Sequence, residues 1–230
     1  MKTLGKNRSL QLIFQSFYLA LAVVACAGSV GFFDRTFNGD FYIYFTNLSN
    51  YLCAGIMLLE LIQTVRKQAD SYVTTAPALR VISMLGLVLT FLVFNLLLAN
   101  DPARDPALNY KVECVLCHIV LPILYVADWV IFYEHGKINR KLPLLCALFP
   151  LVYLLYVFAH AAVWKFDSSV MNYAGTDPII YPYFFLNPER VGLSGMLIWV
   201  LALLLGFILL GYLFMALDRL LGKSHEGAST

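Results

Sequence analysis

The chain alternates between long apolar stretches and short polar connections. Each apolar stretch has about the 20 residues that an α-helix needs to cross the hydrocarbon core of a membrane. The six stretches cover residues 9–31, 42–65, 79–99, 112–133, 142–164 and 194–217. Only one connection is long, at about residues 165–192. We therefore predict one all-α domain, residues 1–230, built as a bundle of six transmembrane helices.

The composition agrees with this prediction. The chain is 60% hydrophobic and 13% charged, whereas a soluble domain has about 25% charged residues. The formal net charge of +2 is too small to indicate binding to nucleic acid. We expect an integral multi-pass protein surrounded by membrane lipids, in the inner cell membrane if the source is bacterial. The sequence does not predict an oligomeric state.

Lysine and arginine residues are distributed unequally between the two sides of this bundle. The richer side holds Lys2, Lys6, Arg8, Arg66, Lys67, Arg80, Lys137, Arg140, Lys141, Arg219 and Lys223. The poorer side holds Arg35, Arg104, Lys111, Lys165 and Arg190. Connections rich in basic residues stay in the cytoplasm. Both termini are therefore expected to be cytoplasmic, in agreement with the even number of helices.

Two polar residues stand at matching depth in two of the apolar stretches. Thr46 lies six residues after Asp40, and His118 lies seven residues after Lys111. At 1.5 Å per residue, both sit roughly 10 Å below the outer end of their helices. Polar groups within a membrane span indicate function by default, and a hydroxyl beside an imidazole suggests a nucleophile and its base. The competing interpretation is that both residues only hold helices together through hydrogen bonds.

Further residues are candidates for the remaining roles at this site. His160, near the outer end of the fifth stretch, is a rival base. Asp128 lies about 15 Å from His118 along the helix axis and cannot orient its ring. The third catalytic member is left open between Asn95, Glu113 and Tyr181. Donors for an oxyanion are expected among Asn47, Ser49 and Asn50, which neighbour Thr46 in the sequence.

Other chemistry is less well supported. Cys114-Val-Leu-Cys117-His118 matches the attachment motif of c-type haem, but it lies within an apolar helix that leaves no room for haem. All five cysteines fall in apolar stretches, which indicates packing rather than a disulfide framework. No metal-ligand cluster or phosphate-binding glycine loop is visible. We therefore predict neither a cofactor nor a metal ion.

Three motifs, in this order, resemble those of a known family. They are Tyr44-Phe-Thr-Asn-Leu-Ser-Asn50, His118-Ile-Val-Leu-Pro122 followed by Asp128-Trp129, and Tyr181-Pro-Tyr-Phe-Phe-Leu-Asn187. Together they resemble the FAR-17a/androgen-induced-protein family of six-helix membrane proteins and its bacterial relatives, over almost the whole chain. The resemblance implies a threonine hydrolase of fatty acid esters of hydroxy fatty acids, with Thr46 as nucleophile and His118 as base.

We expect the substrate to be a lipid ester that enters from the outer leaflet. Its acyl chain would lie near Met57, Leu121 and Tyr125, lower in the bundle. Arg190 in the outer connection is the expected partner of a substrate carboxylate, with Tyr181 as a further contact. This connection contains many aromatic residues, including Tyr173, and two interpretations stay open: a lid over the pocket or a segment at the membrane interface.

The alternative function is a non-enzymatic lipid-binding scaffold or transporter. Transporters usually contain broken helices or paired charges within the membrane. Glu60 and Asp128 fall near the inner ends of their helices. We expect them to be interfacial polar residues rather than an intramembrane relay, which favours the hydrolase.

Overall fold

The computed structural model describes residues 5–67, 69–102, 105–166 and 179–227. Six of its helical segments are long and apolar enough to cross a membrane, as the sequence predicts. They are Arg8–Ser29, Phe45–Arg66, Pro77–Leu98, Val112–Phe132, Leu142–Val163 and Pro188–Lys223. The described residues contain helices, turns and irregular segments but no β-strand. The all-α bundle is confirmed at this level.

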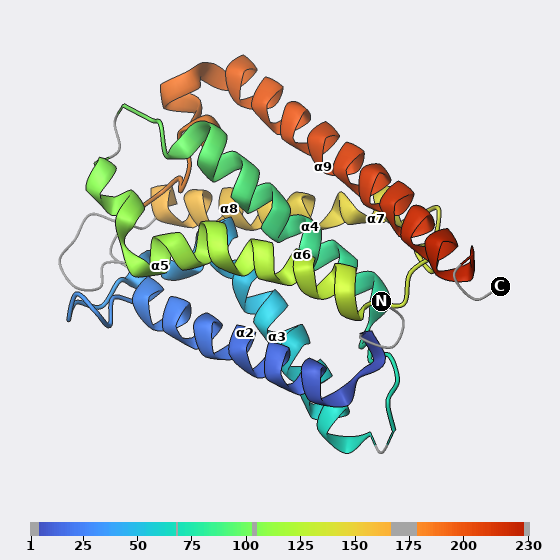
Figure 1. Cartoon of the computed structure of the whole chain (residues 1–230). Coiled ribbons are helices and arrows are strands. Elements are labelled where there is room, and N and C mark those ends of the chain that lie inside the picture. The colour runs from blue at the N-terminus through green and yellow to red at the C-terminus, as the bar shows by residue number, and fades with distance from the viewer. Residues whose placement is uncertain (1–4, 68, 103–104, 167–178, 228–230) are drawn as a thin grey trace.

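The segments are built from shorter elements, whose α-helices are labelled in Figure 1. The α-helices are α2 (Arg8–Ser29), α3 (Phe45–Arg66), α4 (Pro77–Val93), α5 (Val112–Val115), α6 (Leu121–Phe132), α7 (Leu142–Cys146), α8 (Leu148–Phe166) and α9 (Pro188–Gly227). Two π-helices, η2 (Phe94–Leu98) and η4 (Leu116–Val120), extend α4 and join α5 to α6. The 3-10 helices are η1 (Gly39–Tyr42), η3 (Pro106–Tyr110) and η5 (Phe184–Leu186).

The start of α2 and the end of α9 lie at the same end of the bundle (Figure 1). At the other end lie η1, the start of α3 and the start of α5 (Figure 1). The long helix α9 runs along one side, where it packs against α7, α4 and η5. Large apolar side chains such as Leu201, which is 66% exposed, cover its outward face. This surface is suited to contact with lipid.

Two boundaries differ from the predicted ones in a way that matters for the site. The second span begins at Phe45 rather than at residue 42, because Gly39–Tyr42 forms a separate 3-10 turn. Thr46 is therefore in the first turn of its helix. The last span begins at Pro188 rather than at residue 194 and is broken at Gly192, whose φ of 72° suits glycine.

The long outer connection is described only from Ile179 onward. Its expected residues 167–178, including Tyr173, lie outside the described residues. The part that follows folds back against the bundle. Phe185 and Leu186 are buried there, in an apolar cluster with Phe45 of α3 and Tyr153 of α8. The aromatic segment before α9 is thus packed over the start of α3.

At the opposite end of the bundle, three charged residues are buried together. Arg80 donates hydrogen bonds to Glu60 and to Asp128, and it is 1% exposed. The expectation of interfacial positions for Glu60 and Asp128 was wrong, because both side chains are buried. Arg80, which was counted among the basic residues of the richer side, is buried as well. Arg80 lies in the first turn of α4, so its guanidinium can reach into the bundle. A buried charge is tolerated only with such partners.

Candidate functional site

The Thr46 hydroxyl and the His118 imidazole lie within hydrogen-bond reach of each other. The distance between Thr46 Oγ1 and His118 Nε2 is 3.3 Å. The two residues are 72 positions apart in the sequence, and α3 and η4 pack against each other. Thr46 is buried, with 6% exposure. A hydroxyl and a ring nitrogen at this separation have the geometry of a nucleophile and a general base.

The second ring nitrogen of His118 determines which proton the pair can move. His118 Nδ1 lies 2.8 Å from the backbone oxygen of Cys114. A carbonyl oxygen only accepts hydrogen bonds, so in the neutral ring Nδ1 carries the proton. Nε2 then presents its lone pair to Thr46. The Cys114 carbonyl thus orients the imidazole, a role that a carboxylate side chain fills in a serine protease triad.

His118 lies within the π-helix η4, where the hydrogen-bond register is widened by one residue. At its end the Leu121 N–H bonds to the Leu116 carbonyl, five residues back rather than four. The second π-helix, η2, begins at Phe94, whose ring stacks on the His118 ring at 3.9 Å and 26°. Short π-helical turns are rare and are often found at functional sites. Apolar periodicity along the sequence did not reveal them.

The predicted amide residues hold the backbone around this pair. Asn50 donates to the backbone oxygens of Thr46 at 2.8 Å and of Cys117 at 3.2 Å, and so ties α3 to η4. Asn47 donates to the Phe41 carbonyl at 2.8 Å. Asn47 lines the polar cavity described below, whereas Asn50 and Ser49 line neither of the two cavities at the site. Asn50 is therefore placed as a positioning residue.

A polar cavity of about 760 Å³ opens from the pair toward the outer connections. Its lining includes Asp34, Asp101, Asp105, Glu113, Lys111 and Arg190. The side chains of Lys111 and Asp34 form an ion pair at 2.5 Å, which raises the pKa of Lys111. Arg190 pairs with Asp101 at 3.5 Å and lies over the Phe184 ring. Tyr181 also lines this cavity.

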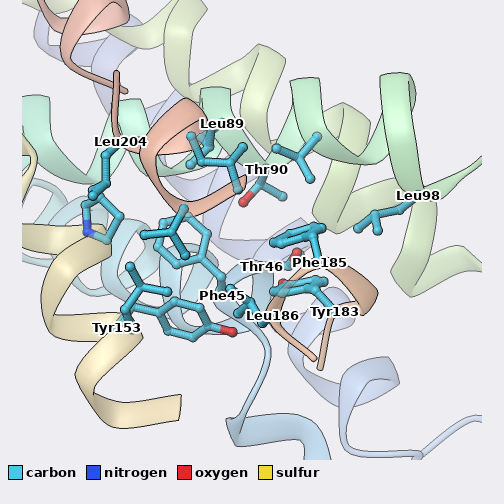
Figure 2. A pocket seen from close by; sticks show the side chains of 15 residues that line it. Phe45, Thr46, Leu89, Thr90, Leu98, Tyr153, Tyr183, Phe185, Leu186 and Leu204 are labelled. Carbon is cyan, nitrogen blue, oxygen red and sulfur yellow. The ribbon is translucent and has the colours of Figure 1, made fainter. Parts of the chain in front are cut away.

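A second, apolar cavity of about 60 Å³ lies on the other side of Thr46, between α3, α4, α8 and α9. Figure 2 shows Thr46 beside the rings of Tyr183 and Phe185, with Leu89, Leu98 and Leu204 around the same space. Met57 and Leu121, the expected surroundings of an acyl chain, are fully buried in the core and line neither cavity. The apolar space is therefore lateral, toward α9, rather than below Thr46.

The other expected residues are placed as follows. The rival base His160 lies 3.2 Å from the Tyr42 hydroxyl and lines neither cavity. Asn95 donates to the Phe91 carbonyl of its own helix at 2.7 Å. Glu113 and Tyr181 both line the polar cavity. None of them is needed to orient His118, because the Cys114 carbonyl does so.

Sequence reasoning missed Tyr183, which lies beside Thr46 and lines both cavities with it. Its phenolic oxygen also faces the backbone N–H groups of Phe45 and Thr46. Burial raises the pKa of Tyr183, more than these hydrogen bonds lower it. The phenol therefore keeps its proton at neutral pH. The sequence signal was present in the aromatic segment before the last span, but it did not indicate which tyrosine reaches Thr46.

Within the described ranges, no group of three or more His, Cys, Asp and Glu side chains could hold a metal ion. All five cysteines are free, and Cys114 and Cys117 are buried against neighbouring helices. Comparison with protein-family models, curated proteins and solved structures finds no match for this chain.

Proposed function

We propose that this protein is an intramembrane hydrolase of lipid esters that uses Thr46 as nucleophile and His118 as general base. The observation that carries the proposal is the 3.3 Å contact between Thr46 Oγ1 and His118 Nε2. The tautomer set by the Cys114 carbonyl leaves Nε2 free of a proton. The pair also lies where a polar and an apolar cavity meet. The resemblance to the FAR-17a/androgen-induced-protein family supports the same roles.

In the first half of the reaction, Thr46 Oγ1 attacks the ester carbonyl and its proton passes to His118 Nε2. The carbonyl π electrons move onto the oxygen, which gives a tetrahedral oxyanion. Its collapse breaks the bond to the leaving alcohol, which takes the proton from His118. In the second half, water attacks the acyl-threonine with His118 again as base. The fatty acid and free Thr46 are released.

The two cavities suit an ester that joins an apolar chain to a polar half. The apolar chain would occupy the lateral cavity beside Leu89 and Leu204. The polar half would lie in the larger cavity, where Asn47, Tyr181 and Arg190 are available to it. Fatty acid esters of hydroxy fatty acids have this form, and the family resemblance favours them. A substrate carboxylate would share Arg190 with Asp101.

The membrane arrangement is part of this proposal. Six helices long and apolar enough to cross a membrane support a multi-pass membrane protein, and the cell membrane is its proposed location. Even when the buried Arg80 is left out of the count, more Lys and Arg residues lie at the end where α2 begins and α9 ends than at the other end. That end is therefore assigned to the cytoplasm. Thr46 and His118 then lie nearer the outer surface. A lipid from the outer leaflet would enter beside α9.

Labelling with a fluorophosphonate probe tests the proposal directly. The wild-type protein should be labelled at Thr46, whereas Thr46→Ala and His118→Ala should not be. Thr46→Ser should restore labelling because it keeps the hydroxyl. Thr64→Val is a matched control, since Thr64 lies on the same helix and its hydroxyl donates to the Glu60 carbonyl at 2.9 Å. Equal labelling of wild type and both alanine variants would overturn the assignment.

A lipid transporter is the second candidate function, and the buried cluster of Glu60, Arg80 and Asp128 favours it. Paired charges within a span are typical of transport pathways. In liposomes, a transporter should speed the transbilayer movement of a fluorescent fatty acid, and Glu60→Gln should stop it while Thr46→Ala does not. The hydrolase proposal expects no acceleration by any of these proteins.

A further inference from the structure

Three residues line both cavities and therefore form the boundary that the two cavities share. They are Thr46, Leu98 and Tyr183. An ester with its apolar chain in one cavity and its polar half in the other must place its carbonyl at this boundary. Thr46 supplies a nucleophile there, and Leu98 is apolar. Tyr183 is the remaining polar side chain of the three.

The position of Tyr183 is fixed by aromatic packing. Its ring stacks on Phe185 at a centroid distance of 5.2 Å and an interplanar angle of 6°. On another side it meets the ring of Tyr44, the residue before α3, at 6.2 Å. Phe185 is itself 4% exposed. The phenolic oxygen is therefore held at the first turn of α3, where donors to a developing charge must be preorganised.

The proton inventory of the site determines the direction of the Tyr183 hydrogen bond. Thr46 has one hydroxyl proton, and His118 Nε2 accepts it, since Nδ1 holds the ring proton. The Thr46 oxygen can then only accept from Tyr183. The Tyr183 oxygen accepts from the backbone N–H groups at the start of α3. In the contact with Thr46 the phenol is thus the donor, and the Tyr153 oxygen, whose own proton goes to the Ile43 carbonyl at 2.9 Å, is the other acceptor within its reach.

We propose that Tyr183 is a catalytic residue whose hydroxyl donates a hydrogen bond to the oxyanion formed when Thr46 attacks the ester carbonyl. This inference rests on the proposed function. As Thr46 Oγ1 becomes bonded to the carbonyl carbon, its lone pair is consumed and it becomes a poorer acceptor. The neighbouring carbonyl oxygen gains the negative charge, so the Tyr183 proton turns to it. No proton is transferred from Tyr183, and the hydrogen bond returns to Thr46 after deacylation.

The test uses the purified full chain, p-nitrophenyl octanoate as substrate and the Tyr183→Phe variant, which retains the ring that stacks on Phe185. Removal of an oxyanion donor should lower kcat by roughly 10²-fold and leave KM within about twofold. Tyr156→Phe is the matched control. Tyr156 packs against the same apolar cluster as Tyr183, but it lines neither cavity. The control should keep wild-type kcat. In a Thr46→Ala background, Tyr183→Phe should cause no further loss.

Replacement of Tyr183 by 3-fluorotyrosine separates the catalytic role from a structural one. The hydroxyl must keep its proton to donate, so activity should fall as pH rises through the Tyr183 pKa. Burial raises that pKa, which places the fall above pH of about 10 in the wild type. Fluorination acidifies the phenol, so the fall should move to lower pH. Tyr153, the titratable neighbour on α8 that bonds to Tyr183, is unchanged in every variant.

The outcomes distinguish this inference from the proposed function. Full kcat in Tyr183→Phe, or an alkaline limb that fluorination does not move, would overturn the role of Tyr183 while the hydrolase stands. Wild-type turnover in Thr46→Ala would instead overturn the hydrolase itself. If Tyr183→Phe does not fold, as judged by its melting temperature, the fluorotyrosine protein decides the question alone.

Discussion

His118 is oriented by the backbone oxygen of Cys114, a partner that no side-chain substitution removes. The proposed mechanism therefore needs no third side chain to orient the imidazole. Substitution of the expected third members, Asn95 and Glu113, should leave the imidazole in the same tautomer. The dependence of the proposed reaction on pH then comes from the protonation of His118 Nε2.

Hydrolysis should fall at low pH, because a protonated imidazole cannot accept the Thr46 proton. We therefore expect kcat/KM to show one acid limb. The measurement is a pH profile of p-nitrophenyl ester hydrolysis. EDTA should have no effect on it, since both roles are filled by side chains. Activity that disappears with EDTA and returns with Zn²⁺ would contradict this account.

Asn50 should support catalysis without contacting substrate. Its amide donates to backbone oxygens on both α3 and η4, so Asn50→Leu loses both hydrogen bonds, including the one that links the two elements. We expect kcat to fall and stability to drop by about 1–3 kcal/mol. Thr64→Val on the same helix is the control for kinetics and for the melting temperature. A variant with normal kcat would show that the two helices keep their register without Asn50.

Thr46 and His118 could be proposed as a pair because both are polar residues toward the same end of two apolar stretches. The helical depth counted for Thr46 did not hold, since α3 begins only at Phe45. The contact with Tyr183 could not be predicted, since it depends on how an irregular aromatic segment folds back over α3. The same holds for Asn50, whose partners are backbone oxygens. A residue type indicates which hydrogen bonds a side chain can make. Which group it bonds to depends on tertiary packing.

At the scale of elements, the proposed base His118 is positioned by the π-helix η4. Deletion of Ile119 should return this turn to α-helical register and rotate His118 relative to α3. Misplacement of a catalytic group by about 1 Å can cost roughly 10²-fold in rate, so fluorophosphonate labelling of Thr46 should become much slower. The helical content by circular dichroism should stay near the wild-type value. Unchanged labelling would mean that the π-turn has no part in placing the imidazole.

The cluster of Glu60, Arg80 and Asp128 joins α3, α4 and α6. Arg80→Met would leave two buried carboxylates without a counter-charge, and breaking a buried pair typically costs about 3–5 kcal/mol. Glu60→Gln keeps one guanidinium and one carboxylate, so it should cost much less. Melting temperatures in detergent measure both changes. Equal decreases in melting temperature in the two variants would show that the cluster does not stabilise the fold through charge balance.

For the whole molecule, the number of spans and the all-α class followed from the lengths of the apolar stretches. The inward turn of Arg80 was missed because charge counting treats every residue near a helix end as exposed. The cavities were missed for a different reason. A cavity is space that packing leaves unfilled, and no single stretch of sequence records it. The lateral position of the apolar cavity beside α9 is such a property.

This lateral cavity should set the length of acyl chain that the protein accepts. Val200 of α9 lines it, whereas Leu201, the next residue, is 66% exposed on the outward face. Val200→Phe should fill the space and lower kcat/KM for long-chain p-nitrophenyl esters, with little effect on the acetate ester. Leu201→Phe adds a ring to the same helix and should change neither. The ratio of kcat/KM between palmitate and acetate esters is the measurement. If both variants lower this ratio equally, the acyl chain does not enter beside α9. If neither does, the chain lies in the polar cavity, and Thr46 approaches the ester carbonyl from the opposite side.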